Sequence, residues 1–322
     1  MLVRLFLFFT LLDHTGAIAQ PSSKGTHREI APIKFPIGAY GKLKTIAMDY
    51  QGNLLAGVSW QPEGKDGKKH YAVKKVSPTG NLLQTWTLKD QLGAKMIHGC
   101  DDGKVYIAGN GFLAMFDEDG KELKRIDVDE VLNGRPIAAG LYATDQHVFV
   151  AYEPSGKGTL RAMESIYRFN RDLTGVKKII ERQYGCCGHI DLEVVDGKLL
   201  VAENTRHRVN SFTLDGNPLG RWGSRDRQSI EGFTACCNPC NTDVGSDGNI
   251  YTFESGVGRI KRYTPEGKYL GLVGYVDTTK FDRGNRVAAQ SCYIPSEVDK
   301  DGNRIYVLDI RKHIIRVLER SE

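Results

Sequence analysis

A unit of three short β-type runs recurs along this chain, and it limits the folds that the chain can adopt. It is clearest in residues 189–222, 240–272 and 294–320. Each copy has a strand, an Asp-Gly turn, a second strand that ends in an acid and, after a short loop, a third strand. Glycine tolerates positive φ, so Asp-Gly favours tight hairpins, and the alternation in RVNSF fits a half-buried strand. Weaker copies precede these three. The turn is marked by Gly52, Gly103, Gln146, Gly197, Gly248 and Gly302.

Six units, each with four short strands, predict an all-β fold, the six-bladed β-propeller. The last unit has room for only three strands before the chain stops at Glu322. Residues 30–40 belong to no unit, so we expect them to supply the missing outer strand and close the ring, removing a pair of open sheet edges. The expected blades lie near 43–90, 94–128, 137–183, 187–223, 237–275 and 290–320 plus 30–40.

The N-terminus is typical of a secretory signal peptide. Arg4 precedes the apolar run Leu5–Leu12, which is too short to span a bilayer, and Ala17-Ile18-Ala19 is a small-x-small cleavage site. We therefore expect residues 1–19 to be removed and residues 20–322 to form a secreted or periplasmic propeller with no membrane span. The net charge is +5, with acids and bases interleaved, which argues against a nucleic-acid partner. We expect a monomer.

The repeat resembles the NHL repeat, a propeller unit of the NHL and TolB-like class. VAENTRHRVNSFTLDG carries an acid after the second strand and an Asn-x-Arg-Val-type turn, and Arg208, Arg259 and Arg316 match the arginine position. The segments GCCGHIDL and ACCNP are similar to those of secreted bacterial NHL-repeat propellers with twin Cys-Cys pairs. The resemblance implies a fold far more than an activity.

Six of the seven cysteines precede an innermost strand at a similar distance from its turn. They are Cys186, Cys187, Cys236, Cys237, Cys240 and Cys292, and they belong to three consecutive units. We expect them to gather at one face of the ring near its axis, where propellers usually meet ligands. Cys100 is the exception and is expected within the innermost strand of the second blade.

Three interpretations of these cysteines stay open. Each adjacent pair, Cys186–Cys187 and Cys236–Cys237, can form a strained vicinal disulfide, because neighbouring Cα atoms lie only about 3.8 Å apart. Alternatively, the cysteines bridge loops of neighbouring blades or stay as small buried hydrophobes. The third interpretation is a metal site made by Cys236, Cys237, Cys240 and His189, although C-C-x-x-C is not the paired spacing of a zinc site.

His189 is the most informative histidine. Its counterparts by spacing are Lys44, Lys95, Cys240 and Ile294, and a side chain at this position is expected to point toward the channel. NHL-repeat lyases that cleave amidated peptides hold zinc with histidines at such positions. This sequence offers one match, with His98 as a possible second group.

The other candidates are polar residues near the same mouth. Asn238 and Asn241 flank Pro239, either as an ordinary turn or as amides that bind a ligand. Glu203, Glu254 and Asp309 end second strands, and their repetition predicts a structural pairing with the turn or with the repeat arginines.

These features leave three functions open. The first is a non-catalytic propeller that binds a small polar ligand, a glycan or a protein at the channel mouth through Cys186, Cys187, His189, Cys236, Cys237, Asn238, Asn241, Lys44 and Lys95. The second is a lyase or hydrolase that uses His189, with or without a metal. The third is a redox or metal-handling protein. No cofactor is favoured, and a transition metal such as zinc is the alternative.

Overall fold

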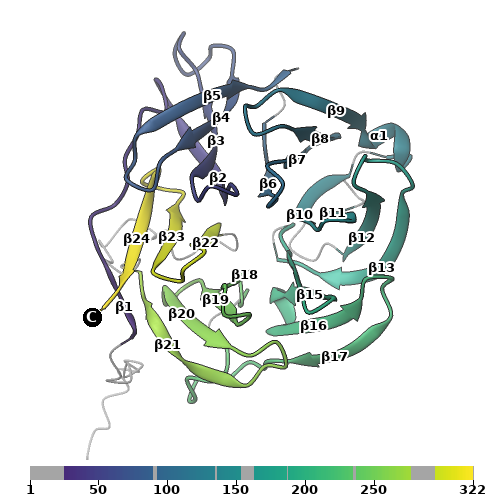
Figure 1. Cartoon of the computed structure of the whole chain (residues 1–322), viewed down its shortest axis with the longest axis vertical. Helices are drawn as coiled ribbons and strands as arrows, with labels where there is room; N and C mark the ends of the chain where they lie inside the picture. Colours follow the sequence, from purple (N-terminus) through teal and green to yellow (C-terminus); the bar gives the residue numbers. More distant parts are fainter. Residues whose placement is uncertain are drawn as a thin grey trace, which may run out of the picture.

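The chain forms a ring of six four-stranded antiparallel sheets, which confirms the predicted six-bladed β-propeller (Figure 1). The structure is a computed structural model that describes residues 25–89, 93–134, 136–153, 163–186, 188–234, 237–276 and 294–321. Residues 1–19, the expected signal peptide, lie outside these ranges. Within the described ranges, no helix combines the length and the apolar character that a membrane crossing requires.

The strands follow the order of the repeats. Blade 1 holds β2 (Lys42–Met48), β3 (Leu54–Trp60), β4 (His70–Val76) and β5 (Leu82–Thr87). Blade 2 holds β6 (Met96–Gly99), β7 (Val105–Gly109), β8 (Phe112–Phe116) and β9 (Glu122–Asp127), followed by the helix α1 (Val128–Val131). Blade 3 holds β10 (Ile137–Ala143), β11 (His147–Glu153), β12 (Met163–Asn170) and β13 (Lys177–Tyr184).

Blade 4 holds β14 (Asp191–Val195), β15 (Lys198–Glu203), the 3-10 turn η2 (Asn204–Arg206), β16 (Arg208–Thr213) and β17 (Pro218–Trp222). Blade 5 holds β18 (Asn241–Val244), β19 (Ile250–Glu254), β20 (Arg259–Tyr263) and β21 (Tyr269–Tyr275). Blade 6 holds β22 (Ser296–Val298), β23 (Arg304–Asp309), β24 (Ile314–Arg320) and β1 (His27–Glu29). In Figure 1 the first strand of each blade is nearest the axis, and β5, β9, β13, β17 and β21 form the perimeter.

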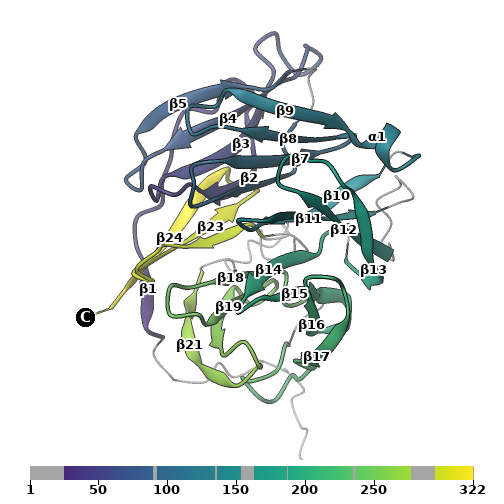
Figure 2. The same ribbon diagram turned by 45° about the vertical axis from the view of Figure 1, so that its right-hand side comes forward.

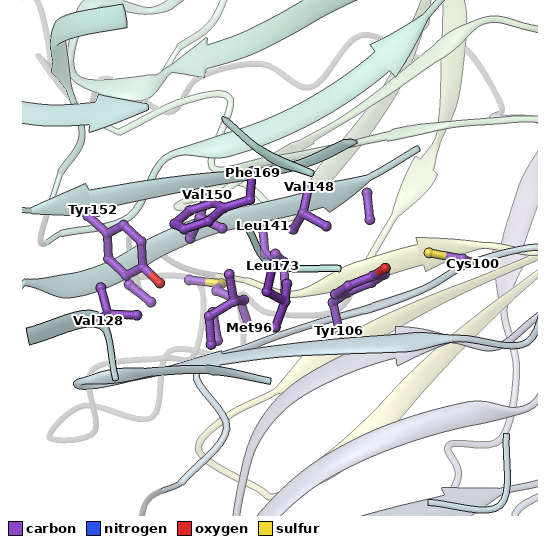
Figure 3. Close-up of a cluster of buried hydrophobic side chains, with 14 residues drawn as sticks. Met96, Cys100, Tyr106, Val128, Leu141, Val148, Val150, Tyr152, Phe169 and Leu173 are labelled. Carbon is purple, nitrogen blue, oxygen red and sulfur yellow. The ribbon is translucent and has the colours of Figure 1, made fainter. Parts of the chain in front are cut away.

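The hydrophobic core is divided among the blade interfaces. Each pair of neighbouring blades has its own apolar cluster, so the second strand of a blade is buried on both faces and reads as a continuous apolar run. Figure 3 shows the cluster between blades 2 and 3, where Met96 and Tyr106 meet Leu141, Val150 and Phe169. Among the described residues, the cluster between blades 4 and 5 has the fewest buried members, Val195, Leu200, Val209 and Ile250.

The acid that ends the second strand pairs with the repeat arginine, as predicted. Glu203 accepts a hydrogen bond from Arg208, Glu254 is paired with Arg259 at 2.7 Å, and Asp309 with Arg316 at 2.9 Å. Arg316 also contacts Glu29 of β1 at 2.6 Å. These pairs join the second and third strands of each C-terminal blade, so the repeated acids are structural.

The N-terminal segment closes the ring, although its pairing starts earlier than predicted. β1 pairs with β24 through residues 27–29 (Figure 2). The backbone of Ile33 exchanges two hydrogen bonds with Ile315. The expected strand over residues 30–40 is therefore wrong in its bounds. Pro32 and Pro36 carry no N–H group and interrupt the ladder, and the rest of the segment crosses to blade 1, where Phe35 and Ile37 pack.

We expect Glu254→Ala to lower the free energy of unfolding by about 3–5 kcal/mol, because it leaves two buried cations without their carboxylate. Glu254 is 1% exposed, and Lys261, which is 0% exposed, lies 3.1 Å from it beside Arg259. Urea unfolding measures the change. The control is Glu266→Ala, which removes an exposed carboxylate paired with Lys198. Equal effects from the two substitutions would contradict the structural role of the repeat acids.

Ile33 belongs to the segment that closes the ring. We therefore expect Ile33→Ala to lower the free energy of unfolding by about 2–5 kcal/mol, the usual cost of deleting a buried aliphatic side chain. Ile33 is 7% exposed and packs among Leu43, Tyr306 and Ile315. Leu219→Ala is the control, since Leu219 is 54% exposed on β17. An Ile33→Ala protein with an unchanged melting temperature would show that the closing segment carries no stability.

Candidate functional site

Two cavities lie around the ring axis, one toward each end of the innermost strands. The mouth cavity, about 810 Å³, lies where the innermost strands begin and is lined by residues of blades 1, 2, 4 and 6. The channel cavity, about 420 Å³, is lined by all six innermost strands and extends to the side where these strands end in turns. The two cavities carry opposite charge.

The mouth cavity brings together three of the predicted site residues, Lys44, Lys95 and His189. Lys44 sits at a bulge of β2, where the register with β3 shifts. Lys95 precedes β6 and donates its backbone N–H to Ala108 over 2.9 Å, while the backbone N–H of His189 bonds to Cys186 before β14 begins. The equal spacing of these residues from their turns therefore placed them correctly around one opening.

The mouth cavity is basic. Lys42, Arg311 and His313 line it together with the three residues above, and no described carboxylate lies within ion-pair distance of Lys42, Lys44 or Arg311. Burial lowers the pKa of Lys44, with the charges of Lys42 and Lys69 as further causes. Burial also lowers the pKa of Lys95, opposed by the Glu153 charge. An anion placed here is therefore favoured on Coulombic grounds.

Both histidines of the mouth cavity are neutral at physiological pH. Burial, followed by the Lys95 charge, lowers the pKa of His189 to about 3. Burial and the charges of Lys44 and Lys42 lower the pKa of His313, whose Nδ1 accepts the Leu43 N–H over 3.3 Å. Their uncharged rings therefore lie beside the charged lysines, where they can contact a bound anion.

The cysteine loops of blades 4 and 5 meet each other. The Sγ atoms of Cys186 and Cys237 are 2.7 Å apart, although 51 residues separate them in sequence. Asn204 holds the first loop by accepting the Cys186 N–H over 2.8 Å, and Glu164 accepts the Gly185 N–H over 2.7 Å. Cys187, Cys236 and Cys292 lie outside the described residues, so the vicinal disulfides remain a prediction. The sulfur approach favours the alternative in which neighbouring blades are bridged.

Cys240 does not face the channel, contrary to its predicted equivalence with His189. It is buried in the core between blades 5 and 6, and its thiol donates to the Phe253 carbonyl over 3.0 Å. Burial raises the pKa of this thiol far above its usual value. Cys240 is thus separated from the mouth cavity, and no group of three or more His, Cys, Asp or Glu among the described residues is arranged to hold a metal ion.

Asn238 and Asn241 are engaged in the framework. Asn238 is 0% exposed, and its amide donates to the Ser255 carbonyl and accepts the Ser255 N–H. The Asn241 amide donates to the carbonyl and hydroxyl oxygens of Ser296 in the next blade. Asn238 therefore fits the turn interpretation, whereas Asn241 lines the channel cavity as well as joining two blades.

His98 and Cys100 belong to the channel cavity and not to the mouth. His98 lies on β6, donates from Nε2 to the Ala143 carbonyl over 3.1 Å, and packs against Tyr142 with ring centroids 4.3 Å apart. Burial lowers its pKa to about 4. Cys100 follows the end of β6 and was expected within it. His98 and His189 therefore serve different cavities and do not form a common metal site.

The channel also has an acidic lining that was not predicted from the sequence. Asp191 and Glu193 of β14, Asp243 of β18 and Glu297 of β22 all face this cavity. Burial raises the pKa of Asp191 to about 6 and that of Asp243 to about 7. Burial and the neighbouring carboxylates also raise the pKa of Glu193 and Glu297 well above the ordinary value. The available signal was the recurrence of acids in the innermost strands DLEVV, NTDV and SEV.

Comparison with known proteins identifies the fold and no closer relationship. No protein-family profile and no curated protein matches the chain in sequence. A Bacteroides thetaiotaomicron protein of unknown function shares 15% identity with a TM-score of 0.59, covering 91% of this chain and 76% of its own. A luciferin-regenerating enzyme shares 11% identity with a TM-score of 0.57, covering 88% and 95%. A Xanthomonas campestris gluconolactonase shares 14% identity with a TM-score of 0.55, covering 88% and 87%.

The cysteine geometry predicts a covalent link between residues 186 and 237 in protein prepared without reductant. Mass spectrometry of a non-reduced digest is expected to show one cross-linked pair of peptides from the two loops. Cys186→Ser should abolish it, and Cys240→Ser, which alters a buried core thiol, should leave it intact. Separate peptides, each with an internal Cys-Cys link, would instead establish the vicinal disulfides.

Proposed function

We propose that this propeller binds a small polar ligand with a carboxylate or phosphate group in the mouth cavity. The observation that carries the proposal is the convergence of Lys42, Lys44, Lys95 and Arg311 on one opening at the axis. Lysine and arginine provide the donors that recognise such oxyanions. A cavity of about 810 Å³ has the size typical of small-molecule sites.

Desolvation supports the proposal. The lowered pKa values of Lys44 and Lys95 mean that each ammonium group has lost part of its hydration, and Lys44 also lies near the positive charges of Lys42 and Lys69. A bound anion compensates both lysines for the lost hydration and relieves the repulsion at Lys44, so the free energy gained on binding includes the restored stability of the charged lysines. The ligand should therefore raise both pKa values.

We also propose that the protein acts outside the cytoplasm. The N-terminal sequence has the pattern of a secretory signal, and an oxidising space allows cysteines in facing loops to become linked. A link at Cys186 and Cys237 holds the loop that leads into His189, because the Cys186 carbonyl accepts the His189 N–H over 3.2 Å. The cysteines then shape the mouth indirectly.

The second candidate function is a hydrolase, favoured by the neutral imidazole of His189 beside the partly desolvated Lys95. An ammonium group stabilises a developing oxyanion, and the neutral imidazole can hydrogen bond to the substrate, although a pKa of about 3 makes it a weak general base for opening a lactone or an ester. The product of lactone opening is a hydroxy acid, which the basic mouth would retain. Turnover of gluconolactone that His189→Asn abolishes would establish this function over simple binding.

We expect gluconate, galacturonate or glucose 6-phosphate to bind the mouth, with neutral glucose binding at least tenfold more weakly. Lys44→Gln and Lys95→Gln should each lower the affinity about tenfold, roughly the contribution of one charge-assisted hydrogen bond. Isothermal titration calorimetry measures both, and added salt should weaken binding. Stronger binding of the phosphate ester than of both sugar acids would identify the preferred oxyanion.

The control is Lys177→Gln, which removes an exposed lysine from the outermost strand of blade 3. This substitution changes the net charge by the same amount as Lys44→Gln and leaves the residues of the mouth cavity unaltered. If Lys177→Gln weakens binding as much as Lys44→Gln does, or if glucose binds as well as the acids, the proposed site is wrong.

A further inference from the structure

The channel cavity contains four carboxylates that no cation of the described residues neutralises. Asp191, Glu193, Asp243 and Glu297 come from the innermost strands of three consecutive blades and line a volume of about 420 Å³. Within the described part of the chain, none of the four has an arginine, lysine or histidine within ion-pair distance. Buried carboxylates are ordinarily paired or protonated.

The acids nearer the turn side of the same cavity contrast with these four. Asp102 is paired with Arg171 at 2.9 Å, Asp101 with Lys300 at 3.0 Å, and Asp49 with Lys75 at 2.8 Å. Three of the carboxylates near the rim therefore have cations, whereas within the described ranges the interior carboxylates have none. The imbalance is local to the middle of the channel.

Three of the four interior carboxylates have a structural role that explains them. Asp191 accepts the N–H and hydroxyl of Thr242 over 2.6 and 2.8 Å, and Asp243 accepts the Val298 N–H. The backbone N–H of Met48 lies beside the Glu297 carboxyl and favours its charged form. Each contact runs from the innermost strand of one blade to that of the next, so these acids connect blades 4, 5, 6 and 1 around the axis.

Glu193 has no such role. It is 7% exposed, it lines the cavity, and its carboxylate accepts no hydrogen bond and forms no ion pair within the described residues. A buried carboxyl group without a hydrogen-bond partner destabilises the folded state, and for Glu193 no contact with the described residues offsets this cost. A hydrogen-bond donor that enters the cavity from outside removes this cost, so Glu193 is an observation that points to a ligand.

We propose that the channel cavity is a binding site for a linear organic polycation with two or more primary amines, such as a diamine or a polyamine. The carboxylates come from three strands that stand around the axis, which suits separate ammonium groups on one flexible chain. They are not gathered into the arrangement that one metal ion needs. This site is distinct from the basic mouth and has the opposite charge preference.

The remaining lining is compatible with an amine. Burial, followed by the charge of nearby Glu193, raises the pKa of Tyr142 on β10. Aromatic faces attract ammonium groups. His98 packs against Tyr142 and stays neutral, so it does not compete for the carboxylates. The ammonium groups of the ligand thus meet two favourable partners, carboxylate oxygens and an aromatic ring.

Binding should depend on pH, because the interior carboxylates carry raised pKa values. Below about pH 6 Asp191 and its neighbours hold protons and attract a cation weakly, and affinity should rise as the pH passes through about 6 to 7. The ligand then displaces protons from the cluster. The other titratable or charged groups that line the cavity are Asp49, Tyr50, His98, Cys100, Asp101, Asp102, Tyr142, Asp145, Arg171 and Lys300.

The test is calorimetric titration of the full-length protein with spermidine and putrescine at pH 8 and pH 5, at fixed ionic strength. We expect spermidine to bind more tightly than putrescine, and at least tenfold more tightly at pH 8 than at pH 5, with release of protons. Calcium chloride is titrated in parallel. The proposal would be overturned if calcium bound more tightly than spermidine. It would also be overturned if neither spermidine nor putrescine gave a measurable heat of binding.

Glu193→Gln should lower spermidine affinity at least tenfold without lowering the melting temperature, because the fold makes no bond to this carboxylate. Glu297→Gln keeps the acceptor for the Met48 N–H and should also weaken binding. Asp145→Asn, an exposed rim acid with the same charge change, should alter affinity less than about twofold. If Asp145→Asn lowered spermidine affinity as much as Glu193→Gln does, the effect would come from the overall negative charge of the protein, and the proposed site would be wrong. The oxyanion affinity of the mouth serves as an independent readout in every variant.

Discussion

The pairing of β1 with β24 is the contact on which the rest of the ring depends. Each blade of a propeller keeps a short outer edge, and the last blade reaches the four strands of the others only when the N-terminal segment covers the outer edge of β24. Here the fourth strand comes from residues 27–29, some 290 residues away from its partner along the chain. The contact of Arg316 with both Glu29 and Asp309 joins the closing strand to the repeat pairing of blade 6.

Closure has a direct consequence for chemistry. Once six blades surround one axis, their innermost strands are too close for large apolar side chains to fill every position, and the short side chains and carboxylates there hydrogen bond to the next blade. Asp191 with Thr242 and Asn241 with Ser296 are such contacts. The polar groups of the axis thus hold the ring together and also form its cavities. The division into a basic mouth and an acidic channel follows from which residues stand at the beginning and in the middle of these strands.

The weakest apolar interface coincides with the most concentrated polar and sulfur contacts. Between blades 4 and 5 the fully buried apolar cluster is small. The same pair of blades has the Asp191–Thr242 hydrogen bonds and the approach of the Cys186 and Cys237 sulfurs. A covalent link at this position would restrict the loops of both blades where apolar packing contributes least.

Sequence periodicity was a reliable guide to position along the axis and a poor guide to side-chain direction. Distance from the turn correctly grouped Lys44, Lys95 and His189, because each precedes the turn glycine of its blade by eight residues. The same rule failed for Cys240, whose side chain packs between blades 5 and 6. In a strand, a shift of one residue reverses the face that a side chain occupies, and the loops before the innermost strands differ in conformation from blade to blade.

The sequence by itself determined the number of blades, the turn positions, the structural pairing of Glu203, Glu254 and Asp309 with their arginines, and the existence of an N-terminal closing segment. These are local or repeated features, so hydrogen-bonding geometry within one hairpin is enough to specify them. Only the tertiary structure decided that the lysines of blades 1 and 2 share a cavity with His189, and that Glu193 lies without a partner among Asp191, Asp243 and Glu297. Those relations depend on the close approach of different blades at the axis, where residues far apart in sequence share one small, poorly solvated volume.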